Sequence, residues 1–130
     1  MLDAFQLTIA SWGALALLLL IQILVADFFG IRAKHLPGSL VAANHADPLF
    51  RATRTVANTN ESIAAYLVVI LFCVFSGANA TYTGYLSWAY VVARAGYAVC
   101  YYCNIQILRS ILFGISLLAL LGLVLTGMFT

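Results

Sequence analysis

The sequence predicts an all-α integral membrane protein, a four-helix bundle that forms a single domain over residues 1–130. Of the 130 residues, 65% are hydrophobic and only 8% are charged, whereas soluble domains are about 45–50% apolar. The charges are also clustered, since all six Lys and Arg residues lie between positions 32 and 109. Four apolar stretches follow one another, each near the ~20 residues that cross a bilayer as a helix. The net charge of +2 gives no indication of a nucleic-acid partner.

The first predicted span covers residues 5–29 and has the apolar run LALLLLIQILVA at its centre. Gln22 is its one strongly polar interior residue, and Asp27 and Gly30 mark its end. The opening residues MLDAFQLT contain Asp3 but no basic residue, which is not typical of a secretory signal peptide. We therefore expect this segment to be a retained anchor. A hydrophilic loop over residues 31–48 follows it.

The other three spans are predicted at residues 49–76, 82–103 and 107–128. Asp47 and Pro48 suit the start of the second span, as its N-cap and its first-turn proline. Residues 77–81 form a short turn, and residues 104–106 connect the third span to the fourth. No span contains an internal proline, so uninterrupted helices are expected.

Basic residues predict the orientation of the bundle. The loop after the first span and the start of the second contain Arg32, Lys34, Arg51 and Arg54, and Arg109 lies on the same side. The opposite side contains no Lys or Arg. Because cytoplasmic loops carry the excess of basic residues, we expect the basic loops in the cytoplasm and both termini outside.

Two predicted helices each carry a polar stripe with intervals of 3, 4 and 3 residues, which places its members on one helix face. On the second helix the stripe consists of Arg51, Arg54, Asn58 and Glu61. On the third helix it consists of Arg94, Tyr97, Tyr101 and Asn104. Charged groups in hydrocarbon cost roughly 2.5–3.5 kcal/mol each on insertion scales, so they normally pair and mark a site. Polar contacts that merely fasten helices together are the alternative, but they rarely need this many charges.

Depth along the helices predicts an ion pair between Glu61 and Arg94. At 1.5 Å per residue, Glu61 lies ~15 Å below Arg51 and Arg94 lies ~15 Å below Asn104. Above this pair we expect a polar pocket open to the cytoplasm, formed by Arg51, Arg54, Asn58, Tyr97, Tyr101 and Arg109. Its excess of positive charge suits an anionic ligand that carries carboxylates.

The combined pattern resembles the MAPEG family, the membrane-associated proteins of eicosanoid and glutathione metabolism. It reads R-x-x-R-x-x-x-N-x-x-E from Arg51, R-x-x-Y-x-x-x-Y from Arg94, and Arg-Ser at the start of the fourth span. The resemblance covers the whole chain in the order of its spans, and its specific part runs from Arg51 to Ser110. At Val56 and Ala57 the chain departs from the basic residues that many members carry.

The resemblance implies a homotrimer that binds glutathione between protomers near the cytoplasmic side. The residues it assigns to glutathione binding are Arg32, Arg51, Arg54, Asn58, Glu61, Arg94, Tyr97, Tyr101 and Ser110. Lys34 competes with Arg32 for the contact from the first helix. The resemblance assigns stabilisation of the glutathione thiolate to Arg109, and Tyr101 is a second catalytic candidate that can add a hydroxyl donor.

The activity implied is that of a membrane-bound glutathione transferase or peroxidase of the bacterial inner membrane, working in detoxification. Glutathione is its co-substrate, and no metal is expected. Its other partners are membrane lipid and a lipophilic electrophile or hydroperoxide that enters from the bilayer. A non-enzymatic lipid-binding or scaffold protein on the same fold is the main alternative, since the family contains one. A small transporter comes third, because the spans lack the broken helices typical of transporters.

The remaining cysteine and histidine residues are interpreted as structural. Cys100 and Cys103 have the C-x-x-C spacing of redox motifs but fall inside a predicted membrane helix. Ordinary packing is therefore favoured over redox or metal chemistry. His35 and His45 lie in the hydrophilic loop without repeated ligand spacing, and we expect them to be solvated.

Overall fold

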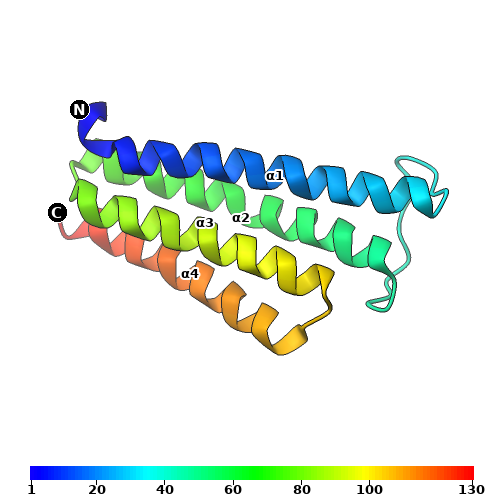
Figure 1. The fold of residues 1–130 in the computed structure, drawn as a ribbon. Helices are drawn as coiled ribbons and strands as arrows, with labels where there is room; N and C mark the ends of the chain where they lie inside the picture. Colours follow the sequence, from blue (N-terminus) through cyan, green and yellow to red (C-terminus); the bar gives the residue numbers. More distant parts are fainter.

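A computed structural model describes residues 1–130 and confirms the all-α fold. After a short 3₁₀ turn, η1 (Leu2–Phe5), the chain forms four helices: α1 (Gln6–Arg32), α2 (Pro48–Ser76), α3 (Ala80–Tyr102) and α4 (Gln106–Met128). They run side by side, with both chain termini at one end and the loop of residues 33–47 at the other (Figure 1). The observed helices follow the order and the approximate bounds predicted from the sequence.

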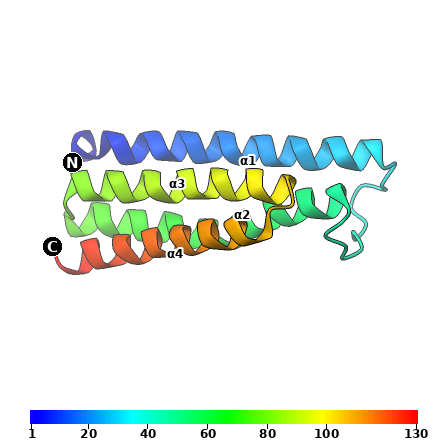
Figure 2. The same ribbon diagram turned by 60° about the horizontal axis from the view of Figure 1, so that its bottom comes forward.

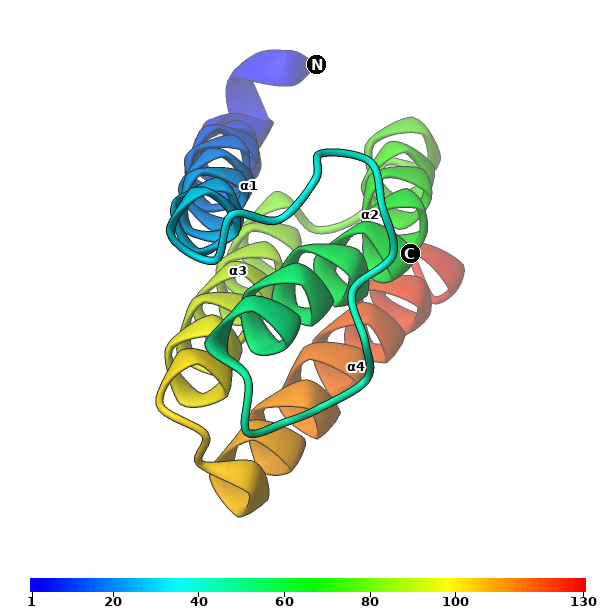
Figure 3. The same cartoon turned by 90° about the vertical axis from the view of Figure 1, so that its right-hand side faces the viewer.

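Helices α2 and α3 lie between α1 and α4. Each of the two central helices packs against both outer helices and against the other, as the turned view in Figure 2 and the end-on view in Figure 3 show. Residues on α2 and α3 are therefore the ones best placed to meet one another inside the bundle. Both predicted polar stripes lie on these two helices, except that Asn104 falls in the turn after α3, where it takes a left-handed conformation with φ of 58°.

Three helices are long and apolar enough to cross a membrane: the N-terminal segment Leu2–Arg32, α2 and α4. The third helix does not reach the same hydropathy, because its buried face carries Thr83, Ser87 and Arg94. It is nevertheless as long as α4 and lies alongside the other helices. That α3 also crosses the membrane stays a prediction, supported by this position.

The start of α2 is fixed by its cap. Asp47 Oδ1 accepts a hydrogen bond from the Leu49 backbone N–H at 3.0 Å, and Pro48 occupies the first turn, as the sequence predicted. At the other end Gly77 takes a left-handed conformation with φ of 72°, which suits glycine. The N–H of Ala78 then bonds to the carbonyl of Cys73 at 2.9 Å. Both ends of the helix that carries the first polar stripe are thus defined.

The apolar core occupies the end of the bundle that holds the termini. We call this region the packed half and define it by twelve buried residues: Phe5, Leu15, Tyr66, Val69, Ile70, Cys73, Val74, Ala78, Tyr90, Val91, Ala119 and Leu123. Tyr66 and Tyr90 stack with ring centroids 4.5 Å apart. Helix α4 approaches α2 closely here, because Gly127 lies directly against the ring of Phe72. The other half of the bundle contains the polar stripes.

Candidate functional site

The polar stripe of α2 forms as predicted, with its residues on the face that looks toward α3 and the exterior. Arg54 Nη1 forms an ion pair with Glu61 Oε1 at 3.4 Å, the only ion pair in the chain. The two side chains are 40% and 59% exposed. Glu61 stands at the middle of a 29-residue helix, a depth at which an exposed carboxylate would face hydrocarbon.

Arg94 is the largest fully buried side chain of the protein. Its Nη2 donates to Asn58 Oδ1 at 2.6 Å and to Thr59 Oγ1 at 3.2 Å, and its guanidinium lies 4.4 Å from the centre of the Tyr97 ring. Its Nε and Nη1 have no hydrogen-bond partner. The structure therefore holds a buried cation among neutral groups, with two donors left over.

The predicted ion pair between Glu61 and Arg94 is wrong. Asn58 stands between the two charges, because its Nδ2 donates to Glu61 Oε2 at 3.5 Å while its Oδ1 accepts from Arg94. Glu61 and Arg94 lie in the same region, as their matching depth predicted. However, Asn58, about one helical turn before Glu61 on α2, is the residue that bonds to Arg94. The result is a chain of four side chains that runs from Arg54 through Glu61 and Asn58 to Arg94.

Arg109 and Tyr101 lie in contact and line one hollow, whereas Arg51 and Arg54, also expected in the polar pocket, do not line it. The Arg109 guanidinium lies 4.4 Å from the centre of the Tyr101 ring, and Tyr97 meets Tyr101 edge-on with centroids 5.6 Å apart. A hollow of about 220 Å³ opens at this point, lined by Asn58, Tyr97, Tyr101, Arg109, Ser110 and Phe113. All but Phe113 were singled out from the sequence.

A second hollow of about 530 Å³ adjoins the first at the start of α4. It is lined by Gln106, Ile107, Arg109, Ser110 and Ile111, so Arg109 and Ser110 border both spaces. One nitrogen of Arg109, Nη1, is buried without a partner. A ligand that extends from one hollow to the other would pass beside Arg109. We call this half of the bundle the site half. It is formed by the α2 stripe, by residues 94–101 of α3 and by residues 109–113 of α4.

Arg51 faces away from the hollow. Its Nη1 donates to the backbone carbonyl of His45 at 2.7 Å, and its Nη2 lies 3.5 Å from the carbonyl of Tyr102. This arginine therefore ties the loop before α2 to the end of α3. Its Nε has no partner.

Arg32 is not brought to the hollow within one chain. As the last residue of α1, it lines a separate cavity of about 390 Å³ together with Phe29, Ala33, Asp47, Pro48 and Leu49. Lys34, its competitor in the sequence analysis, takes a left-handed conformation with φ of 53° just after the helix. Neither residue makes a hydrogen bond to the other predicted site residues.

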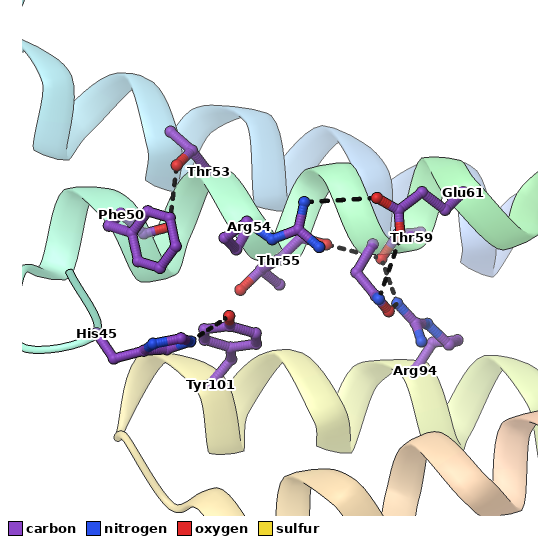
Figure 4. A network of polar contacts seen from close by, with 10 residues as sticks. His45, Phe50, Thr53, Arg54, Thr55, Thr59, Glu61, Arg94 and Tyr101 are labelled. Carbon is purple, nitrogen blue, oxygen red and sulfur yellow. Dashed lines mark hydrogen bonds and ion pairs between the residues drawn. The ribbon is translucent and has the colours of Figure 1, made fainter. Parts of the chain in front are cut away.

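Sequence reasoning missed His45, which was expected to be solvated. Its Nε2 lies 3.1 Å from the Tyr101 hydroxyl, and the two rings stack with centroids 6.0 Å apart (Figure 4). The other loop histidine, His35, bonds only to Ser39. No sequence spacing connects positions 45 and 101. The only indication of a role for His45 was that it lies two residues before Asp47, the N-cap of α2. The bond from Arg94 to Thr59 was also missed, because a threonine in a membrane helix is usually interpreted as a packing residue.

The excess of positive charge in the site half indicates which kind of ligand it can bind. The site half contains four guanidiniums (Arg51, Arg54, Arg94 and Arg109) and a single carboxylate, Glu61. Arginine remains charged at any physiological pH and binds carboxylates through paired donors. No group of three or more His, Cys, Asp or Glu side chains is arranged to hold a metal ion. The arrangement suits an anionic ligand and the stabilisation of a negative charge near Arg109.

Comparison with known families finds one match. The model described as MAPEG family matches residues 8–129, nearly the full length of the chain and the whole of the site half. No curated protein matches the sequence.

Proposed function

This chain belongs to the MAPEG family, a family of membrane proteins of glutathione and eicosanoid metabolism, and on that premise we propose that it is a membrane-bound glutathione transferase or peroxidase. In this proposal the site half binds glutathione and converts its thiol to the thiolate. The thiolate then attacks a lipophilic electrophile or a hydroperoxide. Family membership alone leaves the activity open, because members without enzymatic activity share the fold.

The observation that carries the proposal is the position of Arg109 over Tyr101 at the edge of the hollow. A free cysteine thiol has a pKa of about 8.5, so most of it is protonated at neutral pH, and the thiolate is the nucleophile. A guanidinium beside the sulfur stabilises the anion without itself gaining or losing a proton. The guanidinium of Arg109, a residue that lines the hollow, supplies the positive charge for that purpose.

The rest of glutathione matches the remaining charges. A carboxylate of glutathione suits the guanidinium of Arg54, and the ammonium group suits Glu61, the only carboxylate of the site half. Asn58, Tyr97 and Ser110 offer neutral hydrogen-bonding groups along the hollow. Arg94 lies deeper and holds Asn58 in place through the bond at 2.6 Å.

The exposure of Arg54 and Glu61 supports assembly as a homotrimer. A charged pair that is 40% and 59% exposed at the middle of a membrane helix is costly in lipid. A second copy of the chain packed against this face removes the pair from hydrocarbon and brings its own α1 toward the site. In that arrangement Arg32, which stands apart within one chain, reaches the site from the neighbouring protomer.

The orientation proposed from the basic loops places the site half at the cytoplasmic side of the inner membrane. Ser39, in the loop between α1 and α2, would then be inside, and both termini outside. An impermeant maleimide should label a cysteine placed at either terminus of the protein in intact cells. It should leave Ser39→Cys unlabelled, and labelling of that variant would place the site on the opposite side.

The proposed function is tested with detergent-purified protein mixed with glutathione. Formation of the thiolate is followed by its ultraviolet absorbance, and turnover is followed with a chlorinated nitrobenzene and with a fatty-acid hydroperoxide. Thiolate formation together with turnover of either compound supports the proposal. If glutathione binds but neither thiolate nor turnover appears, the protein is a binding or scaffold member of the family.

A further inference from the structure

His45 connects the candidate site to the surface through a single hydrogen bond. Its Nε2 lies 3.1 Å from the hydroxyl of Tyr101, and its ring meets Phe50 edge-on with centroids 5.0 Å apart. Its backbone carbonyl accepts the bond from Arg51. His45 is therefore held in place by contacts from α2 and α3, although the residue itself is exposed to solvent.

The direction of this hydrogen bond follows from the surroundings of Tyr101. The tyrosine is buried, and His45 Nε2 is the only polar partner of its hydroxyl. A buried O–H group requires an acceptor, and in the tautomer with Nε2 unprotonated the hydroxyl donates to that nitrogen. The same tyrosine lines the hollow, and its oxygen keeps lone pairs for a group that binds there.

We propose that His45 is a positioning residue that acts through Tyr101 and accepts the proton released when a thiol ionises in the hollow. This inference rests on the function proposed above. The S–H bond breaks, its electron pair stays on sulfur, and the proton moves to the Tyr101 oxygen. The proton formerly on that hydroxyl moves to His45 Nε2. The products are a thiolate, a neutral Tyr101 hydroxyl that donates to it, and an imidazolium.

The exposed position of His45 completes the transfer, because the imidazolium loses a proton to water from its other ring nitrogen. No other group near the hollow fits this role. Arginine cannot accept a proton. Glu61 reaches the hollow only through the amide of Asn58, which cannot relay a proton, and Asp47 caps α2. His45 is thus the one base that contacts a hydroxyl group of a residue lining the hollow.

The test separates the rate of thiolate formation from its final amount. A proton acceptor changes the rate, whereas the final amount depends on how well the anion is stabilised. In stopped-flow absorbance measurements with glutathione, His45→Gln should slow thiolate formation by about 10²-fold and leave the final absorbance unchanged. Glutamine can keep a hydrogen bond to Tyr101 but cannot take up the proton. His35→Gln, in the same loop and bonded only to Ser39, is the matched control and should react at the wild-type rate.

A second measurement distinguishes proton transfer from a merely structural role. The variant His45→Ala is mixed with glutathione and a series of imidazoles of different basicity. If His45 accepts the proton, these bases should restore the rate in proportion to their basicity, as general base catalysis requires. A compound that only fills the space should restore the rate regardless of its basicity.

The outcomes are distinct. A wild-type protein that forms no thiolate overturns the proposed function and this inference with it. Thiolate formation that is equally fast in wild type and His45→Gln overturns the inference alone. A lower final absorbance in His45→Gln, at an unchanged rate, also overturns it and assigns His45 to the shape of the hollow.

Discussion

The two halves of the bundle are built from the same four helices but differ in how many buried polar groups they satisfy. In the packed half, most buried polar groups find a partner within the chain, and the Thr8 hydroxyl is an exception. The Tyr66 hydroxyl bonds to Ser11 and the Tyr90 hydroxyl to Ser62. The thiol of Cys73 reaches the carbonyl of Leu123.

In the site half, buried donors are left without partners. Buried guanidinium nitrogens without a partner occur on Arg51, Arg94 and Arg109. Native proteins keep few such groups unless a ligand, water or neighbouring chain completes them. We conclude that the packed half supplies most of the stability. The site half is less stable because its polar groups are kept for binding. The predictions below test that division.

The largest effect on folding is expected in the packed half. Leu123 is fully buried, so Leu123→Ala should lower the free energy of unfolding by about 2–5 kcal/mol, measured by denaturation in mixed micelles. The folded variant should still form the glutathione thiolate. Leu121→Ala, at an exposed position of the same helix, is the control and should change stability little. A loss of thiolate formation at unchanged stability would contradict the division.

The largest effect on chemistry is expected at Arg109. Arg109→Ala should lower kcat by about 10²–10³-fold, the usual loss for a charge-stabilising donor, with little change in KM or in unfolding. Steady-state kinetics provide the measurement, with Leu108→Ala as a neighbouring control on the exposed face. Tyr101→Phe is measured alongside. Full turnover in Arg109→Ala together with none in Tyr101→Phe would move the role to the tyrosine.

A smaller effect is expected from the bond between Asn58 and Arg94. In a double-mutant cycle with Asn58→Ala and Arg94→Met, the coupling in unfolding free energy should be about 1.5–3 kcal/mol, as for hydrogen bonds to charged groups. A cycle with Glu61→Gln and Arg94→Met should give less, because Asn58 separates the two charges. Stronger coupling between Glu61 and Arg94 than between Asn58 and Arg94 would instead indicate a direct ion pair between Glu61 and Arg94. Asn58→Ala should also weaken glutathione binding.

The smallest effects come from two glycines of α4, one in each half. A methyl group at Gly127 would meet the Phe72 ring at 2.5 Å, so Gly127→Ala should destabilise the protein by about 1–3 kcal/mol. A methyl group at Gly114 meets nothing within 4 Å, so Gly114→Ala should stabilise it by up to about 1 kcal/mol. Unfolding in mixed micelles measures both. Equal destabilisation by the two changes would show that the site half is packed as tightly as the other.

Much of the fold was predictable because its signals are local. Hydropathy located the helices, and the Asp47–Pro48 pair located the start of α2. The end of α1 was less accurate: the helix continues past Gly30 to Arg32, and the left-handed residue that follows is Lys34 rather than a glycine. A lysine in that conformation has no signature in the sequence.

The site was predictable in composition but not in pairing. Helical spacing identifies which residues share a face, and rise per residue gives their depth. Neither gives the angle between two helices, which decides whether Arg94 meets Glu61 or Asn58. The contact between His45 and Tyr101 joins a loop to a helix across 56 positions, so no periodic pattern could reveal it. The resemblance to the family supplied the role of Arg109, which spacing alone does not assign.

The cap formed by Asp47 and Pro48 also determines where the chain tolerates a change of length. Every residue of the α2 stripe is counted from that fixed starting point. One residue inserted between Pro48 and Arg51 would turn the stripe by about 100° and shift it by about 1.5 Å, which would carry its charges out of the site together. Residues added to the exposed segment 36–43 would leave this register intact. Relatives and engineered variants should therefore differ in the length of the loop before Asp47. They should keep a constant number of residues between the cap and the α2 stripe.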